Sequence, residues 1–314
     1  MKRALAPPVI IIAGPTASGK SALAVELAAG LGGTIINADS QQIYRDLPIL
    51  TAQATPEAMR RAPHRLYGYL DAAERGSVAR WRKLALAEIA VAHAAGSLPI
   101  LVGGTGLYLR ALRHGLAPVP DIPEPIRAEA ATLYRELGGA AFRDRLAAID
   151  PTAAERLPPG DRTRLTRAWE VVRATGAPLA EWQNRASGEA AYQFATLLMM
   201  PPRDALYAAC DARFAGMVEA GALDEVSALA ARGLDADLPA MKAVGVPELL
   251  RHLRGGTPLA DAVTSAQRST RRYAKRQLTW FRHQLVPDLL FDEQFSESLL
   301  HRSRHFINDF LLTS

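Results

Sequence analysis

A segment near the start of the chain has the residue types of a phosphate-binding loop. It reads GPTASGKS and matches the pattern G-x-x-x-x-G-K-[ST], with an apolar run before it and a helical pattern after it. In such a loop, successive backbone N–H groups form a concave site for phosphate oxygens, and the positive end of the following helix adds attraction. Lys20 would supply a charge, and the Ser21 hydroxyl could bind Mg²⁺. We therefore predict a di- or triphosphate site formed by Gly14, Pro15, Thr16, Ala17, Ser18, Gly19, Lys20 and Ser21.

A phosphate loop alone is typical of kinases and of enzymes that hydrolyse ATP or GTP. Such enzymes present a second acid at the end of an apolar strand to hold Mg²⁺. The apolar run LPILVGGTG ends in glycines and Thr105 without a carboxylate, which weakens that interpretation. The Thr105 hydroxyl is expected in the ligand crevice, and its neighbouring glycines would let the backbone approach a ligand. A plain strand-to-helix turn is the alternative for this segment.

An acid does follow the second apolar run, in TIINADSQQ, as Asp39. Because the carboxyl ends of parallel strands face the ligand crevice, Asp39 should lie beside the phosphate loop. Asp-Ser before a turn is also typical of a helix N-cap, so both interpretations stay open. The side chains of Gln41 and Gln42 carry amides, which can pair with the edge of adenine.

Two stretches are rich in arginine. Arg268 to Arg282 reads RSTRRYAKRQLTWFR and has six Lys or Arg and no acid. Helical spacing puts its basic residues on one broad face, namely Arg268, Arg271, Arg272, Lys275 and Arg276. The same spacing predicts an apolar stripe of Ala274, Leu278, Phe281 and Leu285. A solvated surface is the alternative, but such faces are typical of nucleic-acid binding. The second stretch is DRTRLTRAWEVVR, residues 161–173, and two basic surfaces suit a folded RNA.

The order of apolar runs predicts the elements that position these residues. Continuous runs at Val9–Ala13, Thr34–Ala38 and Pro99–Val102 are typical of buried parallel strands. Helical patterns at Ser21–Leu31 and Val78–Ala95 alternate with them. This rhythm predicts an α/β fold with a doubly wound parallel sheet.

The rhythm then breaks at a proline-rich connector after Leu116. From Ile126 to about Arg185 the pattern is helical, and a strand at Phe194–Met200 resumes the core. Beyond it we predict a helix near Leu206–Arg232, a Gly/Pro-punctuated segment over 233–257, a basic helix near Ala262–Leu285 and an edge strand at Asp288–Phe291. The predicted domains are therefore a core of residues 1–115 and 194–314 and a helical insertion of residues 116–193.

Composition is that of a folded globular chain, with 314 residues, 49% apolar and 22% charged. The single cysteine, Cys210, fits a reducing cytoplasm. The N-terminal apolar run is too short for a signal peptide, and no stretch approaches the roughly 20 apolar residues of a membrane span. A net charge of +5 and a pI of about 9.5 favour a polyanionic partner.

The sequence resembles the bacterial tRNA dimethylallyltransferases, also called tRNA isopentenyltransferases, of the IPP transferase family. The resemblance extends along nearly the whole chain in family order, through GPTASGKS, DSQQIYRDLPILTA, PHRL, PILVGGTGLYL, DRTRLTRAWEV, MKAVGVPEL and YAKRQLTWFR. It implies a P-loop NTPase-like fold with the insertion binding tRNA. It also implies transfer of the dimethylallyl group of dimethylallyl diphosphate, with Mg²⁺, to the exocyclic amine of the adenosine 3′-adjacent to the anticodon, releasing pyrophosphate. We expect such a protein to be cytoplasmic and monomeric, and not to associate with a membrane.

The resemblance also implies residue roles. Asp39 would accept the amine proton, Thr16 to Ser21 and Arg213 would contact the pyrophosphate, and Thr105 would line the reaction channel. The implied catalytic set is Thr16, Asp39, Thr105 and Arg213, and the implied metal ligand is Ser21. Contacts to tRNA would come from Asp39, Ser40, Gln41, Gln42, Thr105, Arg127, Thr163, Arg164, Leu165, Thr166, Arg167, the Lys242–Pro247 stretch, Lys275, Arg276, Gln277, Trp280 and Arg282.

The chain departs from the family pattern at a few positions. Gln53 stands where the family usually has Lys, Gly160 where it has Asn, and Val246-Pro247 where it has Tyr-Lys. A related alternative is an adenylate isopentenyltransferase acting on free AMP, ADP or ATP, which needs neither the insertion nor the basic helix. A nucleotide-gated RNA-binding protein without catalysis is the alternative from another class, and Asp39 beside the loop argues against it.

Overall fold

The computed structural model describes residues 6–185, 188 and 190–313. The chain divides into two compact units. Unit 1 comprises Met1–Arg113 with Ala190–Ser314, and unit 2 comprises His114–Glu189. Unit 2 therefore spans nearly the same residues as the predicted insertion of residues 116–193.

Unit 1 is built on a six-stranded sheet with the strand order β3-β2-β4-β1-β5-β6. The strands are β1 (Pro8–Ala13), β2 (Gly33–Asn37), β3 (His64–Arg65), β4 (Leu98–Gly103), β5 (Gln193–Met199) and β6 (Leu289–Phe291). Every pair is parallel, which confirms the predicted α/β class. Ala13 pairs with Gly103, and Asn37 pairs with Val102. The loops after β1, β2 and β4 therefore leave the same edge of the sheet.

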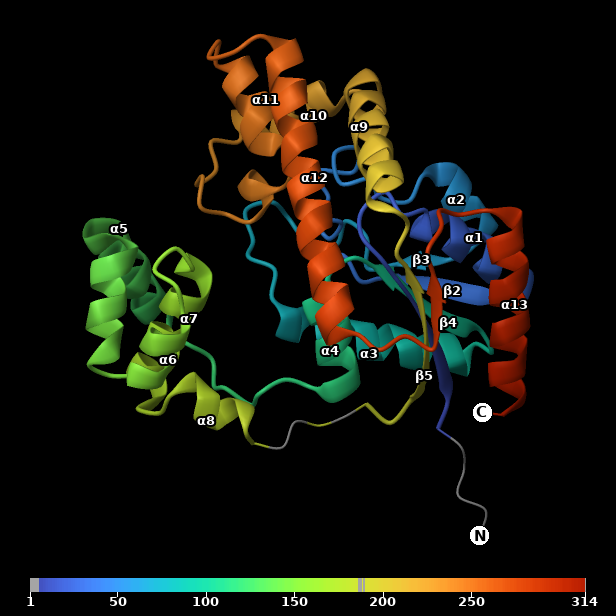
Figure 1. Cartoon of the computed structure of the whole chain (residues 1–314), viewed down its shortest axis with the longest axis horizontal. Helices are drawn as coiled ribbons and strands as arrows, with labels where there is room; N and C mark the ends of the chain where they lie inside the picture. Colours follow the sequence, from blue (N-terminus) through green and yellow to red (C-terminus); the bar gives the residue numbers. More distant parts are fainter. Residues whose placement is uncertain (1–5, 186–187, 189, 314) are drawn as a thin grey trace. The chain divides into compact units, whose positions relative to one another are not determined.

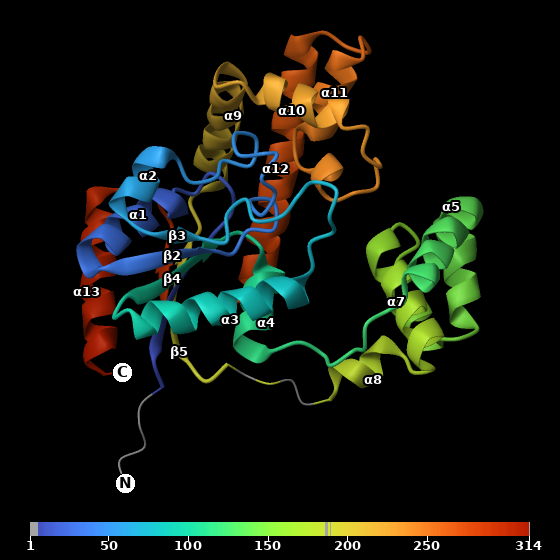
Figure 2. The same ribbon diagram turned by 180° about the vertical axis from the view of Figure 1, so that it is seen from behind.

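Helices cover both faces of this sheet, as Figures 1 and 2 show. Ile10 and Ile12 of β1 pack in one cluster with α1 (Lys20–Leu31) and α13 (Glu297–Leu312). Val9 and Ile11 pack on the opposite face with α3 (Val78–Ala94), α4 (Gly106–His114) and the C-terminal part of α12 (Leu259–Gln284). Burial on both faces explains why these strands have continuous rather than alternating apolar residues.

A further apolar cluster supports the segment that follows β2. The loop residues Ile43, Leu47 and Leu70 pack with α9 (Arg203–Glu219), α10 (Ala222–Ala231), the short 3₁₀ helix η1 (Ala240–Lys242) and α11 (Val246–Leu253). The N-terminal half of α12 completes the cluster through Ala266. The long segment between β2 and α3 is thus held by helices that come much later in the sequence.

Some predicted elements were wrong or missing. The single helix predicted near Leu206–Arg232 is two helices, α9 and α10, because the chain turns at Gly221 with a φ of 103°. The segment over 233–257 contains η1 and α11. The sequence did not predict α2 (Pro56–Arg61), the two-residue β3 or α13. The elements α2 and β3 are too short to show a periodic pattern, and in α13 the apolar residues Leu299 and Ile307 are buried only by tertiary packing.

Unit 2 is helical, with α5 (Glu124–Ala147), α6 (Pro151–Arg156), α7 (Arg162–Thr175) and α8 (Leu179–Gln183). Phe142, Leu165 and Trp169 lie in its own small core. The helix α5 bends at Gly138, whose φ of 72° suits glycine. No helix in the described part of the chain is long and apolar enough to cross a membrane.

Candidate active site

The phosphate loop joins β1 to α1, as the sequence predicted. Gly19 precedes α1 with a φ of 91°, a left-handed conformation that glycine adopts without strain. The first turn of α1 has no acidic residue, and no side chain caps its N-terminus. The backbone N–H groups of this turn therefore remain available to an anion, and the helix dipole favours one there.

Lys20 is buried, with 8% of its surface exposed, and its ammonium donates a hydrogen bond to the Pro15 carbonyl at 3.1 Å. Burial lowers the pKa of Lys20 to about 8, and the nearby Asp39 carboxylate opposes this shift. An amine buried without a full counter-charge gains from an anionic ligand. The residue is thus suited to neutralise a phosphate group.

Thr16 is held by helices from the far end of the chain. Its hydroxyl accepts a hydrogen bond from Arg213 of α9 at 3.1 Å, and its N–H donates to the side-chain carbonyl of Gln277 on α12 at 2.8 Å. Burial lowers the pKa of Arg213, with partial compensation by Asp39. The structure therefore brings Arg213 to the phosphate loop, where the sequence reasoning expected a second pyrophosphate contact.

Asp39 lies just beyond β2 and is 8% exposed. Its backbone is fixed by Asn37, whose side-chain oxygen accepts the Asp39 N–H at 2.8 Å and whose amide donates to the Asp39 carbonyl at 3.0 Å. The Asp39 carboxylate accepts the Gln41 N–H at 3.0 Å. No helix begins between Asp39 and α2, which starts at Pro56, so the helix-cap interpretation is wrong.

Thr105 connects the turn after β4 to the segment after Asp39. Its hydroxyl accepts the Ser40 N–H at 2.9 Å and donates to the Ser40 hydroxyl at 3.1 Å. A Cβ on Gly103 would lie 2.1 Å from the Ala38 carbonyl oxygen, and one on Gly104 would lie 2.2 Å from the Gln277 amide nitrogen. These glycines therefore admit neighbouring protein groups, whereas the sequence reasoning expected them to admit a ligand.

Gln41 and Gln42 use part of their amides to hold loops in place. The Gln42 amide donates to the carbonyls of Thr51 and Ala52, at 3.0 and 2.6 Å. Gln41 accepts the Val244 N–H at 3.2 Å, and it lines the pocket together with Tyr273 of α12. These two glutamines retain hydrogen-bonding groups at the pocket they line.

One pocket brings these groups together. The phosphate loop contributes Thr16, Lys20 and Ser21, and Asp39 lies on the same lining. Gln41, Gln42, Arg213 and Tyr273 also line it. A carboxylate, two cations and the phosphate loop thus face one space, which is what a transfer reaction with an anionic leaving group requires.

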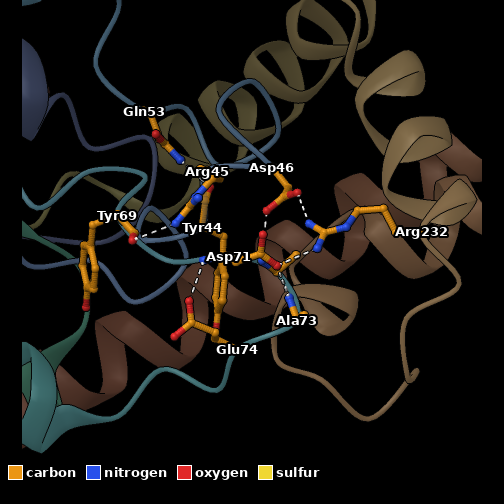
Figure 3. A network of polar contacts seen from close by, with 10 residues as sticks. Tyr44, Arg45, Asp46, Gln53, Tyr69, Asp71, Ala73, Glu74 and Arg232 are labelled. Carbon is orange, nitrogen blue, oxygen red and sulfur yellow. Dashed lines mark hydrogen bonds and ion pairs between the residues drawn. The ribbon is translucent and has the colours of Figure 1, made fainter.

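An ion-pair network steadies the segment between β2 and α3 from outside the pocket (Figure 3). Arg232, just after α10, pairs with Asp46 and, at 2.6 Å, with Asp71. Within the same segment, Gln53 donates to the Tyr44 carbonyl at 2.8 Å. Gln53, which stands where the family usually has Lys, therefore has a structural role in this segment.

The residues predicted to contact tRNA differ in exposure. In unit 1, Lys275, Arg276 and Arg282 are exposed on α12, Trp280 is half-buried, and Lys242 is exposed and pairs with Asp237 at 2.6 Å. In unit 2, Thr163 and Arg164 are exposed, and Arg127, Thr166 and Arg167 are half-buried.

Leu165 and Gln277, which the sequence predicted to contact tRNA, have buried side chains. Leu165 is fully buried in the core of unit 2, because its position on α7 faces α5. Gln277 is 6% exposed, and both ends of its amide are bonded to backbone. The apolar stripe predicted on α12, by contrast, is buried as expected, through Ala274, Leu278, Phe281 and Leu285.

Sequence reasoning missed three residues that shape the pocket or hold its parts. Asn37 fixes Asp39, Tyr273 lines the pocket, and Cys210 contacts the Thr16 carbonyl at 4.0 Å between sulfur and oxygen. Tyr273 lies inside the motif YAKRQLTWFR, where its neighbours' charges dominated the interpretation. Asn37 is the last residue of an otherwise apolar strand, which was the available signal.

Comparison with known proteins identifies what the chain is similar to. The sequence profile described as IPP transferase matches residues 42–284. The tRNA dimethylallyltransferase of Rhodospirillum centenum is 62% identical over 287 residues, which are 91% of each chain. The tRNA isopentenylpyrophosphate transferase of Bacillus halodurans has a solved structure with a TM-score of 0.69 and 36% identity, covering 97% of this chain and 96% of that one. A eukaryotic dimethylallyltransferase solved acting on tRNA has a TM-score of 0.83 and 28% identity, covering 98% of this chain and 80% of that one.

Proposed function

Because the chain belongs to the IPP transferase family, we propose that it is a tRNA dimethylallyltransferase. It transfers the dimethylallyl group of dimethylallyl diphosphate to the exocyclic amine of the adenosine 3′-adjacent to the anticodon. The observation that carries the proposal is the shared pocket of Asp39 and the phosphate loop. That pocket offers a proton acceptor and an anion site on one lining, as transfer of an allylic group to an amine requires.

Bond making and breaking follow from this arrangement. The adenine nitrogen attacks the allylic carbon, the carbon–oxygen bond breaks, and its electron pair leaves with pyrophosphate. The proton of the amine passes to the Asp39 carboxylate. An exocyclic amine is a poor nucleophile, so hydrogen bonding to a fixed carboxylate both orients it and removes its proton. Asn37 supports this role because it fixes the backbone from which the carboxylate projects.

The leaving group develops negative charge that the phosphate loop and two cations can stabilise. Lys20 and Arg213 both line the pocket, and Arg213 also bonds the Thr16 hydroxyl. Charges that are already in place in a buried site act strongly on the transition state, because little reorganisation is needed. The acceptor base must leave its stack to enter, which costs a few kcal/mol and is easiest in a single-stranded loop.

Mg²⁺ is part of the proposal, as the partner of the diphosphate. Mg²⁺ commonly binds through one or two protein oxygens, several waters and substrate phosphates. The described residues contain no cluster of three or more His, Cys, Asp or Glu that could hold a metal without substrate. The exposed Ser21 hydroxyl beside Lys20 fits this mode, and Ser21 would hold the ion. When bound, Mg²⁺ would neutralise charge on the pyrophosphate.

The proposal predicts that Asp39→Ala lowers single-turnover transfer to tRNA by about 10²–10⁴-fold, the usual effect of a positioned acid–base group. Affinity for tRNA and for dimethylallyl diphosphate should stay within a small factor, because neither ligand depends on this one carboxylate. Rates would be measured with labelled dimethylallyl diphosphate, and a thermal melt would check the fold. A folded Asp39→Ala protein with nearly normal turnover would remove Asp39 from the mechanism.

The acceptor is tested separately with the wild-type protein. Labelled dimethylallyl diphosphate is incubated with bulk tRNA or with AMP, and the label should appear in tRNA. Transfer to AMP alone would identify an adenylate isopentenyltransferase. Binding of tRNA without transfer to either acceptor would identify a binding protein and overturn the proposal.

A further inference from the structure

Gln277 occupies an unusual position for a residue in a basic, surface-lying helix. It is 6% exposed, while its neighbours Lys275 and Arg276 are exposed. Its side-chain carbonyl accepts the Thr16 N–H at 2.8 Å, and its amide donates to the Gly104 carbonyl at 2.9 Å. One side chain thus bridges the phosphate loop after β1 and the glycine turn after β4.

The bridge continues to the acceptor side of the pocket. Gly104 is followed by Thr105, which bonds both the N–H and the hydroxyl of Ser40. Ser40 is next to Asp39 in the chain. Tyr273, one helical turn before Gln277 on α12, lines the same pocket as Gln41, and the side chains of Gln41 and Thr105 oppose the rise that burial causes in its pKa. The inner face of α12 therefore contacts the diphosphate site, the glycine turn and the acceptor segment.

We propose that Gln277 is a positioning residue that sets the separation between the diphosphate site and the acceptor site. The inference rests on the proposed transfer reaction, in which the acceptor nitrogen and the allylic carbon must approach in a narrow range of geometry. A misplacement of about 1 Å can reduce such a rate by about 10²-fold. The buried amide bonds hold the two sites together, and this role replaces the tRNA contact predicted from sequence for the same residue.

Gly104 belongs to the same bridge, because its carbonyl accepts the Gln277 amide and its lack of a side chain leaves room for that amide. A Cβ there would lie 2.2 Å from the Gln277 amide nitrogen, which is the far end of a flexible side chain. The same Cβ would lie 3.2 Å from the Gly14 carbonyl oxygen, so Gly104→Ala should displace the Gln277 amide and shift the phosphate-loop backbone only slightly. Gly104 and Gln277 are 173 residues apart in sequence, so their dependence on each other arises only from the fold.

The experiment compares Gln277→Met with Gln284→Met. Both substitutions replace a glutamine of α12 by an apolar residue of similar length, and Gln284 is exposed. Gln277→Met should reduce single-turnover transfer by about 10- to 100-fold at saturating substrates, with tRNA affinity within twofold of wild type. Gln284→Met should leave the rate unchanged. An unchanged rate in Gln277→Met, or a loss of tRNA affinity that accounts for the slower rate, would overturn the proposal.

Two further variants keep the test informative if Gln277→Met is poorly folded. Gln277→Glu keeps the acceptor for Thr16 but can donate to Gly104 only when protonated, so its rate relative to wild type should recover as pH falls. Gly104→Ala should slow transfer as Gln277→Met does. The double variant's rate should fall by less than the product of the two single-variant fold-reductions, because both changes disturb the same contact. A flat relative pH profile together with multiplicative losses would overturn the proposal.

A failure of the transfer reaction itself can be told apart from a failure of this inference. Wild-type protein that does not modify tRNA would refute the proposed function. Gln277 would then be judged by calorimetry with inorganic pyrophosphate. Weaker binding by Gln277→Met than by Gln284→Met would still support its hold on the phosphate loop, and equal binding would refute it.

Discussion

At the residue scale, the chemistry of the site depends on charges that are buried before any substrate arrives. Lys20, Asp39 and Arg213 lie around one pocket, and the charge of Asp39 opposes the pKa lowering of both cations. Sequence could predict Lys20 and Asp39, because each follows a strand end in a recognisable pattern. It could not predict Tyr273 or the bridging amide of Gln277, because their partners are distant in sequence and a polar residue on a helix is usually exposed.

The pKa of Lys20 gives a prediction about pH. Its value is lowered to about 8 from an ordinary 10.5, so between these values the unfolded chain binds more protons and folding stability should rise with pH. A bound pyrophosphate should raise this pKa, so affinity should fall above about pH 8. Calorimetric titration of inorganic pyrophosphate into wild type and Lys20→Met would measure this, since Lys20→Met has no charge to lose. If the ratio of the pyrophosphate affinities of wild type and Lys20→Met stays constant between about pH 8 and pH 10.5, the prediction is contradicted.

At the element scale, the strands and the phosphate loop follow from local sequence, but the support of the acceptor segment does not. Continuous apolar runs predict β1, β2 and β4 because both of their faces are buried. The segment after Asp39 has no regular structure of its own that sequence could reveal. It is held by α10, whose Glu225 carboxylate accepts the N–H groups of Ile49 and Leu50 at 2.7 and 2.8 Å. Burial raises the pKa of Glu225, and these two bonds oppose the rise.

Glu225→Ala should therefore loosen the turn at Ile49 and Leu50 specifically. Removing the carboxylate leaves two backbone donors without their partner, which costs about 1–3 kcal/mol for a buried group. Hydrogen exchange of these two amides should become faster, because local opening becomes easier. Asp224→Ala is the matched control, since Asp224 is exposed in the same helical turn. Equal protection of both amides in the two variants would show that Glu225 does not hold this turn.

At the scale of the whole molecule, positive charge is unevenly divided between the two units. Residues 114–189 contain ten arginines, no lysine and eleven Asp or Glu, a net charge of −1 within a chain of +5. On α7, Arg164 pairs with Asp161 at 2.6 Å, and Arg167 pairs with Glu170 at 3.4 Å. Among the described residues, Lys275 and Arg276 of α12 have no carboxylate partner. The arginine-rich pattern in unit 2 is thus a weaker electrostatic surface than its sequence suggests, because acids that neutralise it come from the same helices.

This division predicts different salt dependence for two matched double variants. Each phosphate neutralised by a cation contributes about 0.7–0.9 to the slope of log affinity against log salt, because counterions are released. Lys275→Gln with Arg276→Gln should flatten the slope for tRNA by about 1.4–1.8. Arg164→Gln with Arg167→Gln should flatten it less, because a cation already paired with a protein carboxylate releases fewer counterions from RNA. Filter-binding titrations over a range of salt would measure both slopes. If the two variants flatten the slope equally, the electrostatic attraction for tRNA is shared by the two units rather than concentrated on α12.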